Sequence, residues 1–253
     1  MKKVNVSLKV SVLILLALCL IVSSCKKEEG TTDGPKTKEN SDKKPTKVET
    51  KKVSNELVAL PFVLPKPMFE GTPQNILVPN LEKPLGKARP PYMAPKGCVN
   101  VSAGKPVASS DEEPIIGEIE FMTDGDKAAA DGSYVELGPF KQHVTVDLGS
   151  KHEIYAILLW HFHKQARVYF DVVVQVADDA DFITNVRTIF NNDHDNSSGL
   201  GIGKDMNYVE TSEGKLIDAK GAVAQFVRFY SNGSNANDLN HYIEVEAWGK
   251  PAK

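Results

Sequence analysis

The sequence predicts an all-β protein built as an antiparallel sandwich or jelly roll, and three observations lead to this class. After Asn100, apolar residues recur at every second position over runs of strand length. Clusters of Gly, Asn, Asp and Ser separate these runs, as turns do. Almost no stretch has the period of an amphipathic helix, so the strand–helix alternation of nucleotide-binding folds is missing.

The chain begins with the pattern of a secretory signal over residues 1–24. Three lysines precede an apolar run from Val10 to Val22, whose 13 residues are too few for a stable transmembrane helix. Val22-Ser23-Ser24-Cys25 also resembles the bacterial lipobox, in which the cysteine receives a diacylglycerol. We therefore expect a lipoprotein anchored through Cys25 to a membrane of the cell envelope, on its extracytoplasmic side.

Residues 25–56 are predicted to form a disordered linker behind this anchor. Lys26 to Glu56 holds nine lysines and seven acidic residues, and Val48 and Val53 are its only aliphatic residues. Such a segment buries too little apolar surface to offset the entropy lost on ordering. It is a spacer that lets the folded part stand off the membrane.

Residues 57–98 form a proline-rich segment, with nine of the fifteen prolines of the chain. Proline at this density excludes helices and central strands. The interleaved apolar residues predict extended chain that packs along the main domain, and a free polyproline-type ligand strip is the alternative.

Residues 99–253 are predicted to be the folded domain. Its expected strands are Val144–Leu148, Glu153–Trp160, Tyr169–Ala177, Arg187–Phe190, Gln225–Tyr230 and Tyr242–Trp248.

Charge and cysteine content narrow the classes of partner. Residues 57–253 contain 18 basic and 26 acidic residues, a balance that argues against nucleic acid and against electrostatic adhesion to anionic lipid. Cys19 leaves with the signal and Cys25 takes the lipid, so Cys98 has no disulfide partner in the mature chain.

Six motifs, in order, resemble the discoidin domain, also called the coagulation factor V/VIII type C domain. They are Asn100–Val107 with Ser109-Ser110, Thr123–Asp126, Val144–Gly149 (VTVDLG), Val172–Asp179 (VVVQVADD), Gln225–Tyr230 (QFVRFY) and Tyr242–Gly249 (YIEVEAWG). The resemblance covers about 150 residues and implies a galactose-binding-like jelly roll whose loops at one end bind a ligand. Because Cys98 has no mate near Gly249, the chain is more similar to bacterial carbohydrate-binding modules than to the animal members.

The Asp124-Gly125-Asp126 turn is a candidate calcium site. Two carboxylates around a glycine suit a hard cation that takes six to eight oxygen ligands. The resemblance adds a hydroxyl, matched here by Ser133, and the first glutamate of the last strand, matched by Glu244. The alternative is a solvated Asp-Gly turn without metal.

A second candidate site is a polar sugar-binding patch, in which planar polar groups match vicinal hydroxyls and an aromatic ring meets the C–H face of the sugar. The polar candidates are His161, His163, Arg167, His194 and Asn196, with Trp160 or Tyr169 as the platform. Two alternatives stay open: a zinc site built on the histidines, and histidines that only cap loops or fill the interior.

No catalytic motif occurs: the chain has no G-x-S-x-G elbow, no glycine-rich phosphate loop and no H-E-x-x-H. We therefore expect a protein that is not an enzyme and that binds a glycan or polysaccharide outside the cytoplasmic membrane. The alternative is a structural domain of the envelope that contacts another protein. Phospholipid binding is less favoured, because the predicted loops are rich in Asn, Asp, Ser and Gly.

Overall fold

The structure is a computed structural model that describes residues 56–69, 73 and 75–253. The predicted signal peptide, Cys25 and the linker up to residue 55 lie outside the described residues. Within the described part of the chain, no helix is long and apolar enough to cross a bilayer.

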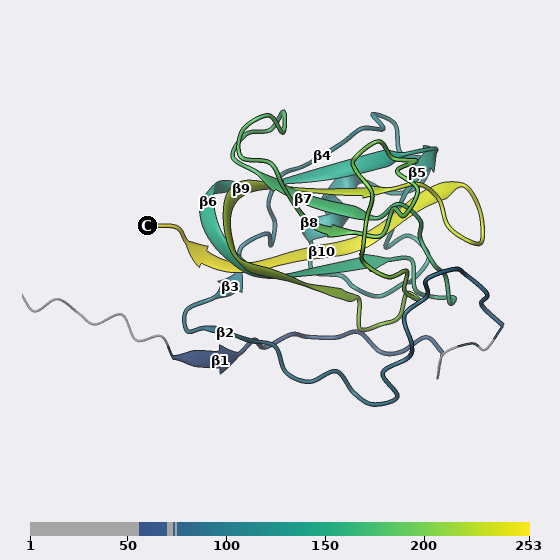
Figure 1. Cartoon of the computed structure of the whole chain (residues 1–253), viewed down its shortest axis with the longest axis horizontal. Helices are drawn as coiled ribbons and strands as arrows, with labels where there is room; N and C mark the ends of the chain where they lie inside the picture. Colours follow the sequence, from purple (N-terminus) through teal and green to yellow (C-terminus); the bar gives the residue numbers. More distant parts are fainter. Residues whose placement is uncertain (1–55, 70–72, 74) are drawn as a thin grey trace, which may run out of the picture. The chain divides into compact units, whose positions relative to one another are not determined.

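The regular secondary structure of the described residues is nearly all strand, so the predicted all-β class is confirmed (Figure 1). Ten strands occur in the described residues, and the one helical segment among them is η1, a 3-10 turn at Ile119–Thr123. The strands are β1 Leu57–Ala59, β2 Met93–Pro95, β3 Val99–Asn100, β4 Val107–Ser109, β5 Val135–Pro139, β6 Gln142–His161, β7 Val173–Ala177, β8 Arg187–Asn191, β9 Lys215–Ser231 and β10 Leu239–Pro251. All pairings between these strands are antiparallel.

Strands β6 and β9 are long, and each takes part in both layers of the sandwich. The first half of β6 pairs with the last part of β9 and with β4. Its second half pairs with the first part of β9 and with β10. The register shifts between Asp147 and His152, where Gly149 has a φ of 79° that a residue with a Cβ rarely adopts. The two separate strands predicted here are therefore one bent strand.

The predicted strand Tyr169–Ala177 is shorter in the structure, where β7 begins at Val173. Asp171 lies before it with a φ of 50°, which takes the backbone out of the extended conformation. Tyr169 forms only an isolated bridge to Ser234.

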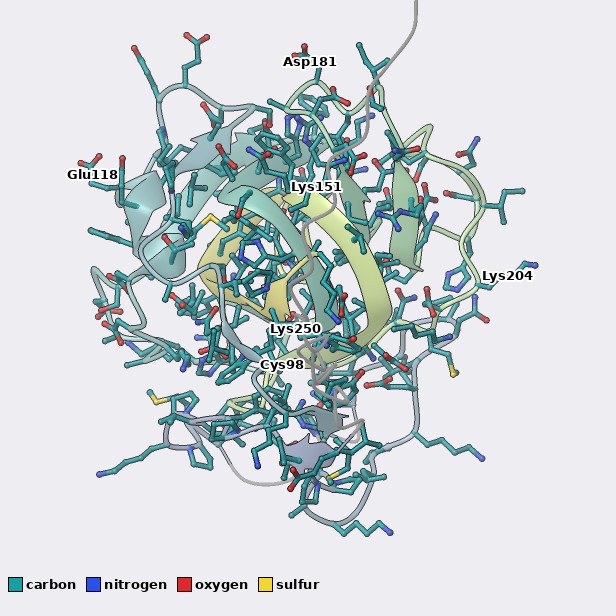
Figure 2. The ribbon with its side chains drawn as sticks, turned by 90° about the vertical axis from the view of Figure 1, so that its left-hand side faces the viewer. Cys98, Glu118, Lys151, Asp181, Lys204 and Lys250 are labelled. Carbon is teal, nitrogen blue, oxygen red and sulfur yellow. The ribbon has the colours of Figure 1, made fainter. Side chains whose placement is uncertain are left out.

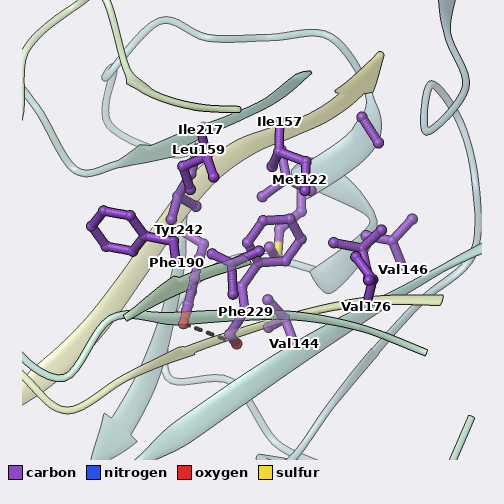
Figure 3. Close-up of a cluster of buried hydrophobic side chains, with 14 of the residues drawn as sticks. Met122, Val144, Val146, Ile157, Leu159, Val176, Phe190, Ile217, Phe229 and Tyr242 are labelled. Atoms are coloured by element: carbon purple, nitrogen blue, oxygen red, sulfur yellow. Dashed lines mark hydrogen bonds between the residues drawn. The ribbon is translucent and has the colours of Figure 1, made fainter. Parts of the chain in front are cut away.

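The main core lies between the two layers (Figure 3). Val144 and Val146 from the first half of β6 point into it, and so do Ile157 and Leu159 from the second half. Alternate positions of each half face inward, as the two-residue period requires.

A second apolar cluster lies on the other side of β6 and β10. Ala156, Leu158 and Trp160 alternate with the inward residues of β6, yet they are fully buried. Leu60, Ala94 and Cys98 of the proline-rich segment pack against this cluster. The second half of β6 is thus covered on both faces, which explains its unbroken apolar run.

Hydrogen bonds hold the proline-rich segment at several points. The Tyr92 hydroxyl donates to the Tyr155 carbonyl at 2.7 Å and to the Asp218 carboxylate at 2.5 Å. The Arg89 guanidinium donates to the carbonyls of Glu213 and Gly214 at 2.8 and 3.0 Å.

We predict that the substitution Leu60→Ala lowers the free energy of unfolding by about 2 kcal/mol, because Leu60 is only 6% exposed and its loss leaves a cavity under β10. Leu64→Ala, at a side chain that is 43% exposed, is the control and should change it by less than about 0.5 kcal/mol. Urea denaturation measures both. Equal stabilities for the two variants would show that the proline-rich segment is not part of the folded unit.

Candidate functional site

Loops from distant parts of the sequence gather at one end of the sandwich, here called the loop end. Gln142 at the start of β6 pairs with Ser231 at the end of β9, and His161 at the end of β6 pairs with Tyr242. Segments 162–172, 192–214 and 232–238 therefore emerge at this end. The bends of β6 and β9 lie at the other end, where Figure 2 shows Lys151 and Lys250.

The loop end contains a buried polar group. His161 and Glu210 are both fully buried, with His161 Nδ1 2.7 Å from Glu210 Oε1. The His161 ring stacks on Tyr169 at a centroid distance of 4.3 Å. Rings enclosed in this way offer no face to a ligand at the surface.

Arg167 connects this buried group to the surface. Its guanidinium lies 4.6 Å from the Phe162 ring centroid and 3.5 Å from His241 Nε2. Burial, and then the charge of Arg167, lowers the pKa of His241 to about 4, so this ring is neutral at pH 7. His241 Nε2 lies 2.9 Å from Glu136 Oε2, and a neutral ring protonated at this nitrogen donates to the carboxylate. Burial raises the pKa of Glu136, and the positive charge of Arg167 partly offsets this increase.

Two other predicted site residues have packing contacts. Trp160 is fully buried, and its indole N–H donates to the Ser212 carbonyl at 3.0 Å. His163 is fully buried too, and its Nε2 lies 3.0 Å from the Lys127 carbonyl oxygen. The sugar patch required exposed side chains, but Trp160, His163 and Tyr169 are all buried in the interior.

The exposed part of the loop end carries an aromatic ring that the sequence analysis missed. Phe140, between β5 and β6, is 79% exposed and has a φ of 68°. Asn240 fixes this turn, since its side-chain amide donates to the carbonyls of Gly138 and Phe140 at 2.8 and 2.9 Å. Left-handed backbone is costly at a bulky residue, so the surrounding structure holds this ring outward against strain.

Three carboxylates lie beside this turn. Asp171, Asp193 and Asp195 have oxygens within 4.8 Å of one another, the only such group of His, Cys, Asp or Glu in the described part of the chain. The loop that carries them is joined to the Phe140 turn, because Lys141 Nζ donates to the Ser198 carbonyl at 2.5 Å and Ser198 donates to Asp193.

The last two predicted ligand residues belong to this surface group. His194 is half-buried and Asn196 is exposed, both on the loop that carries the carboxylates. The structure therefore brings His161, Arg167 and Tyr169 together in the buried group, and places His194 and Asn196 beside the exposed Asp195. No three histidines come close enough in the described residues to hold zinc.

The predicted calcium ligands are only partly assembled. The Gly125 amide donates to Glu244 Oε2 at 3.1 Å, whereas Glu244 Oε1 is buried and makes no hydrogen bond to a described residue. Burial, with the nearby charges of Glu246 and Asp124, raises the pKa of Glu244 to about 9. Asp126 accepts a hydrogen bond from the Ala128 amide at 2.9 Å, and the Ser133 amide donates to Ala130. The oxygens of Asp124, Asp126 and Glu244 do not all lie within 4.8 Å of one another.

Comparison with solved structures finds structural similarities at low sequence identity, with TM-scores of 0.41 to 0.45. The chain is similar to a family 89 glycoside hydrolase from Clostridium perfringens, with 20% identity and a TM-score of 0.45, over 61% of this chain and 15% of that one. It is also similar to a Streptococcus pneumoniae fucose binding module, with 16% identity and a TM-score of 0.44, over 60% of this chain and 96% of that one. The chain is also similar to a chitosan-binding module from Paenibacillus, with 18% identity and a TM-score of 0.41, over 60% of this chain and 99% of that one. No family model and no curated protein sequence matches.

Proposed function

We propose that this protein is a noncatalytic carbohydrate-binding module that takes its glycan at the exposed part of the loop end. The observation that carries the proposal is the strained, outward Phe140 ring beside a loop of carboxylates and amides. Such a ring meets the C–H face of a sugar, while carboxylate and amide groups bind its hydroxyls. Phe140, Asp171, Asp195 and Asn196 are the contact residues in this proposal, with His194 and Arg167 at the margin.

The rigid frame beneath the loops supports this function. The buried pair His161 and Glu210 ties the 208–216 loop to β6, and Asp171 holds the 193–203 loop through the Ser197 hydroxyl at 2.7 Å. A site that is already formed loses little conformational entropy on binding.

We also propose that a calcium ion binds at Glu244 together with the Asp124 turn, as a structural cofactor. The orphaned, buried Glu244 Oε1 supports this, because a buried carboxylate needs a cation or a proton. The ion would join the first loop of the domain to its last strand, with Asp124 or Asp126 moving closer to Glu244.

Finally, we propose that the module is held at the cell envelope through lipid on Cys25, with the charged linker as a spacer. This proposal rests on the sequence of the first 56 residues alone.

The glycan proposal predicts that Phe140→Ala weakens binding by about 5- to 30-fold, which corresponds to the loss of one aromatic contact of about 1–2 kcal/mol. Ile183→Ala is the matched control, because Ile183 is an equally exposed apolar side chain, at 80%, on the turn between β7 and β8. A glycan array identifies the ligand and calorimetry measures the affinities. No binding to any glycan, together with co-purification of an envelope protein, would favour the interaction-domain alternative instead.

The calcium proposal predicts a pH-dependent stability in metal-free protein. The pKa of Glu244 is raised from 4.5 to about 9 on folding, so the stability that its protonation contributes is complete below about pH 4.5 and is lost as the pH rises to about 9. The free energy of unfolding should fall by up to about 1.4 kcal/mol per pH unit in this window. Calcium at 100 times its dissociation constant should restore about 2.7 kcal/mol at pH 8.

Two variants check this result in thermal melts. Glu244→Gln should abolish both the pH dependence and the calcium response, whereas Glu118→Gln, at an exposed glutamate, should keep both. A melting temperature at pH 8 that neither EDTA nor added calcium shifts would contradict the calcium proposal.

The anchor proposal predicts that Cys25→Ser moves the protein out of the membrane fraction or leaves its precursor uncleaved. Cell fractionation and metabolic labelling with a fatty acid measure this, and Cys19→Ser is the control because Cys19 lies within the predicted signal. Wild-type protein without an acyl chain would rule the anchor out.

A further inference from the structure

A cleft lies away from the Phe140 turn, between the proline-rich segment and residues 208–216. Its volume is about 770 Å³, within the range of ligand sites. One wall comes from residues 67–69 and 82–89, and the other from residues 208–216.

Hydrogen bonds and an ion pair fix the two walls to each other. The Asn207 side chain and backbone bond to Pro79 and Asn80, and Lys215 Nζ lies 2.7 Å from Glu82 Oε2. Arg89 donates to the two carbonyls at Glu213 and Gly214. The proline-rich segment thereby forms a cleft that the sandwich alone does not have.

The lining of the cleft is positively charged, although the folded part of the chain is acidic. Its charged residues are Lys83, Lys87, Arg89 and Lys215 against Glu82 and Glu213. The two carboxylates are occupied, because Glu82 pairs with Lys215 and Glu213 lies 3.8 Å from Arg89. Lys83 and Lys87 are exposed and pair with no carboxylate of the described residues, so they supply two unbalanced positive charges.

Apolar groups complete the lining. Met68, Phe69 and Leu85 lie on the wall formed by the proline-rich segment, and Leu216 lies on the opposite wall. Side chains of this kind pack against the C–H faces of sugar rings, whereas lysines at the rim suit carboxylates carried by the same rings.

We propose that this cleft is a second binding site, for an acidic glycan chain built of hexuronate units. Lys83 and Lys87 contact the carboxylates, and the apolar side chains of residues 67–69 and 85 contact the rings. The site goes beyond the proposed function, because it uses none of the loop-end residues and depends on the proline-rich segment.

The test measures binding of oligogalacturonate, the acidic probe, to the full folded region, residues 56–253. Neutral galactan and poly-glutamate are the comparison ligands. The double substitution Lys83→Glu and Lys87→Glu should weaken oligogalacturonate binding by roughly 10-fold, the loss expected for two exposed charge contacts. Lys220→Glu with Lys253→Glu is the control, since both side chains are exposed, lie outside the cleft and change the net charge equally. Raising the salt concentration should weaken wild-type binding much more than binding by the double variant.

Each outcome decides between the two sites. Phe140→Ala should leave the affinity for oligogalacturonate unchanged. If Phe140→Ala weakens this binding and the Lys83→Glu, Lys87→Glu variant does not, the cleft proposal is overturned and the loop-end function stands. Equal loss in the cleft and control variants, or no binding of the acidic probe by wild type, would also overturn it. Poly-glutamate that competes with equal affinity would show an acidic-peptide site instead.

Discussion

The continuous pairing of β6 with β9 is the constraint on which the rest of the structure depends. Both strands bend and cross from one layer to the other, and their pairing shifts register between Asp147 and His152. Each strand therefore starts and finishes at the same end of the sandwich, which collects the loops there. The proposed glycan site lies at this end, where four strand termini meet on one hydrogen-bonded frame.

The proline-rich segment adds an apolar cover and a cleft wall to the sandwich. It covers the outer side of β6 and β10 with Leu60, Ala94 and Cys98, so the indole of Trp160 becomes part of an interior. It also supplies one wall of the basic cleft, through Arg89 and its neighbours. A segment that cannot join a central strand contributes apolar cover and one wall of a cleft instead.

The apolar runs were sufficient to predict the class and most of the strands, since most strands bury at least one face. They did not show that Val144–Leu148 and Glu153–Trp160 form one strand, because Gly149 and Ser150 at the bend are residues typical of a turn between two strands. The sites were harder to predict. The sequence placed His161 at a strand end, where it could contact a ligand. In the structure it is buried against Glu210, which lies 49 residues later in the chain. The exposure of Phe140 depends on Asn240, which is 100 residues away in the sequence. Of the surface site, only the long loop at 192–203, rich in Asn, Asp and Ser, could be recognised from the sequence. Side chains that meet through distant pairings leave no local pattern.

The central claim is that a preformed frame holds the exposed part of the loop end ready to bind a glycan. An amide NMR titration with the glycan that binds best tests this claim most directly. The account predicts shifts concentrated at residues 138–141, 171 and 193–203, with the amides of the β6 and β9 bends unchanged. Shifts confined to the sheet faces, or spread evenly over the sandwich, would contradict it.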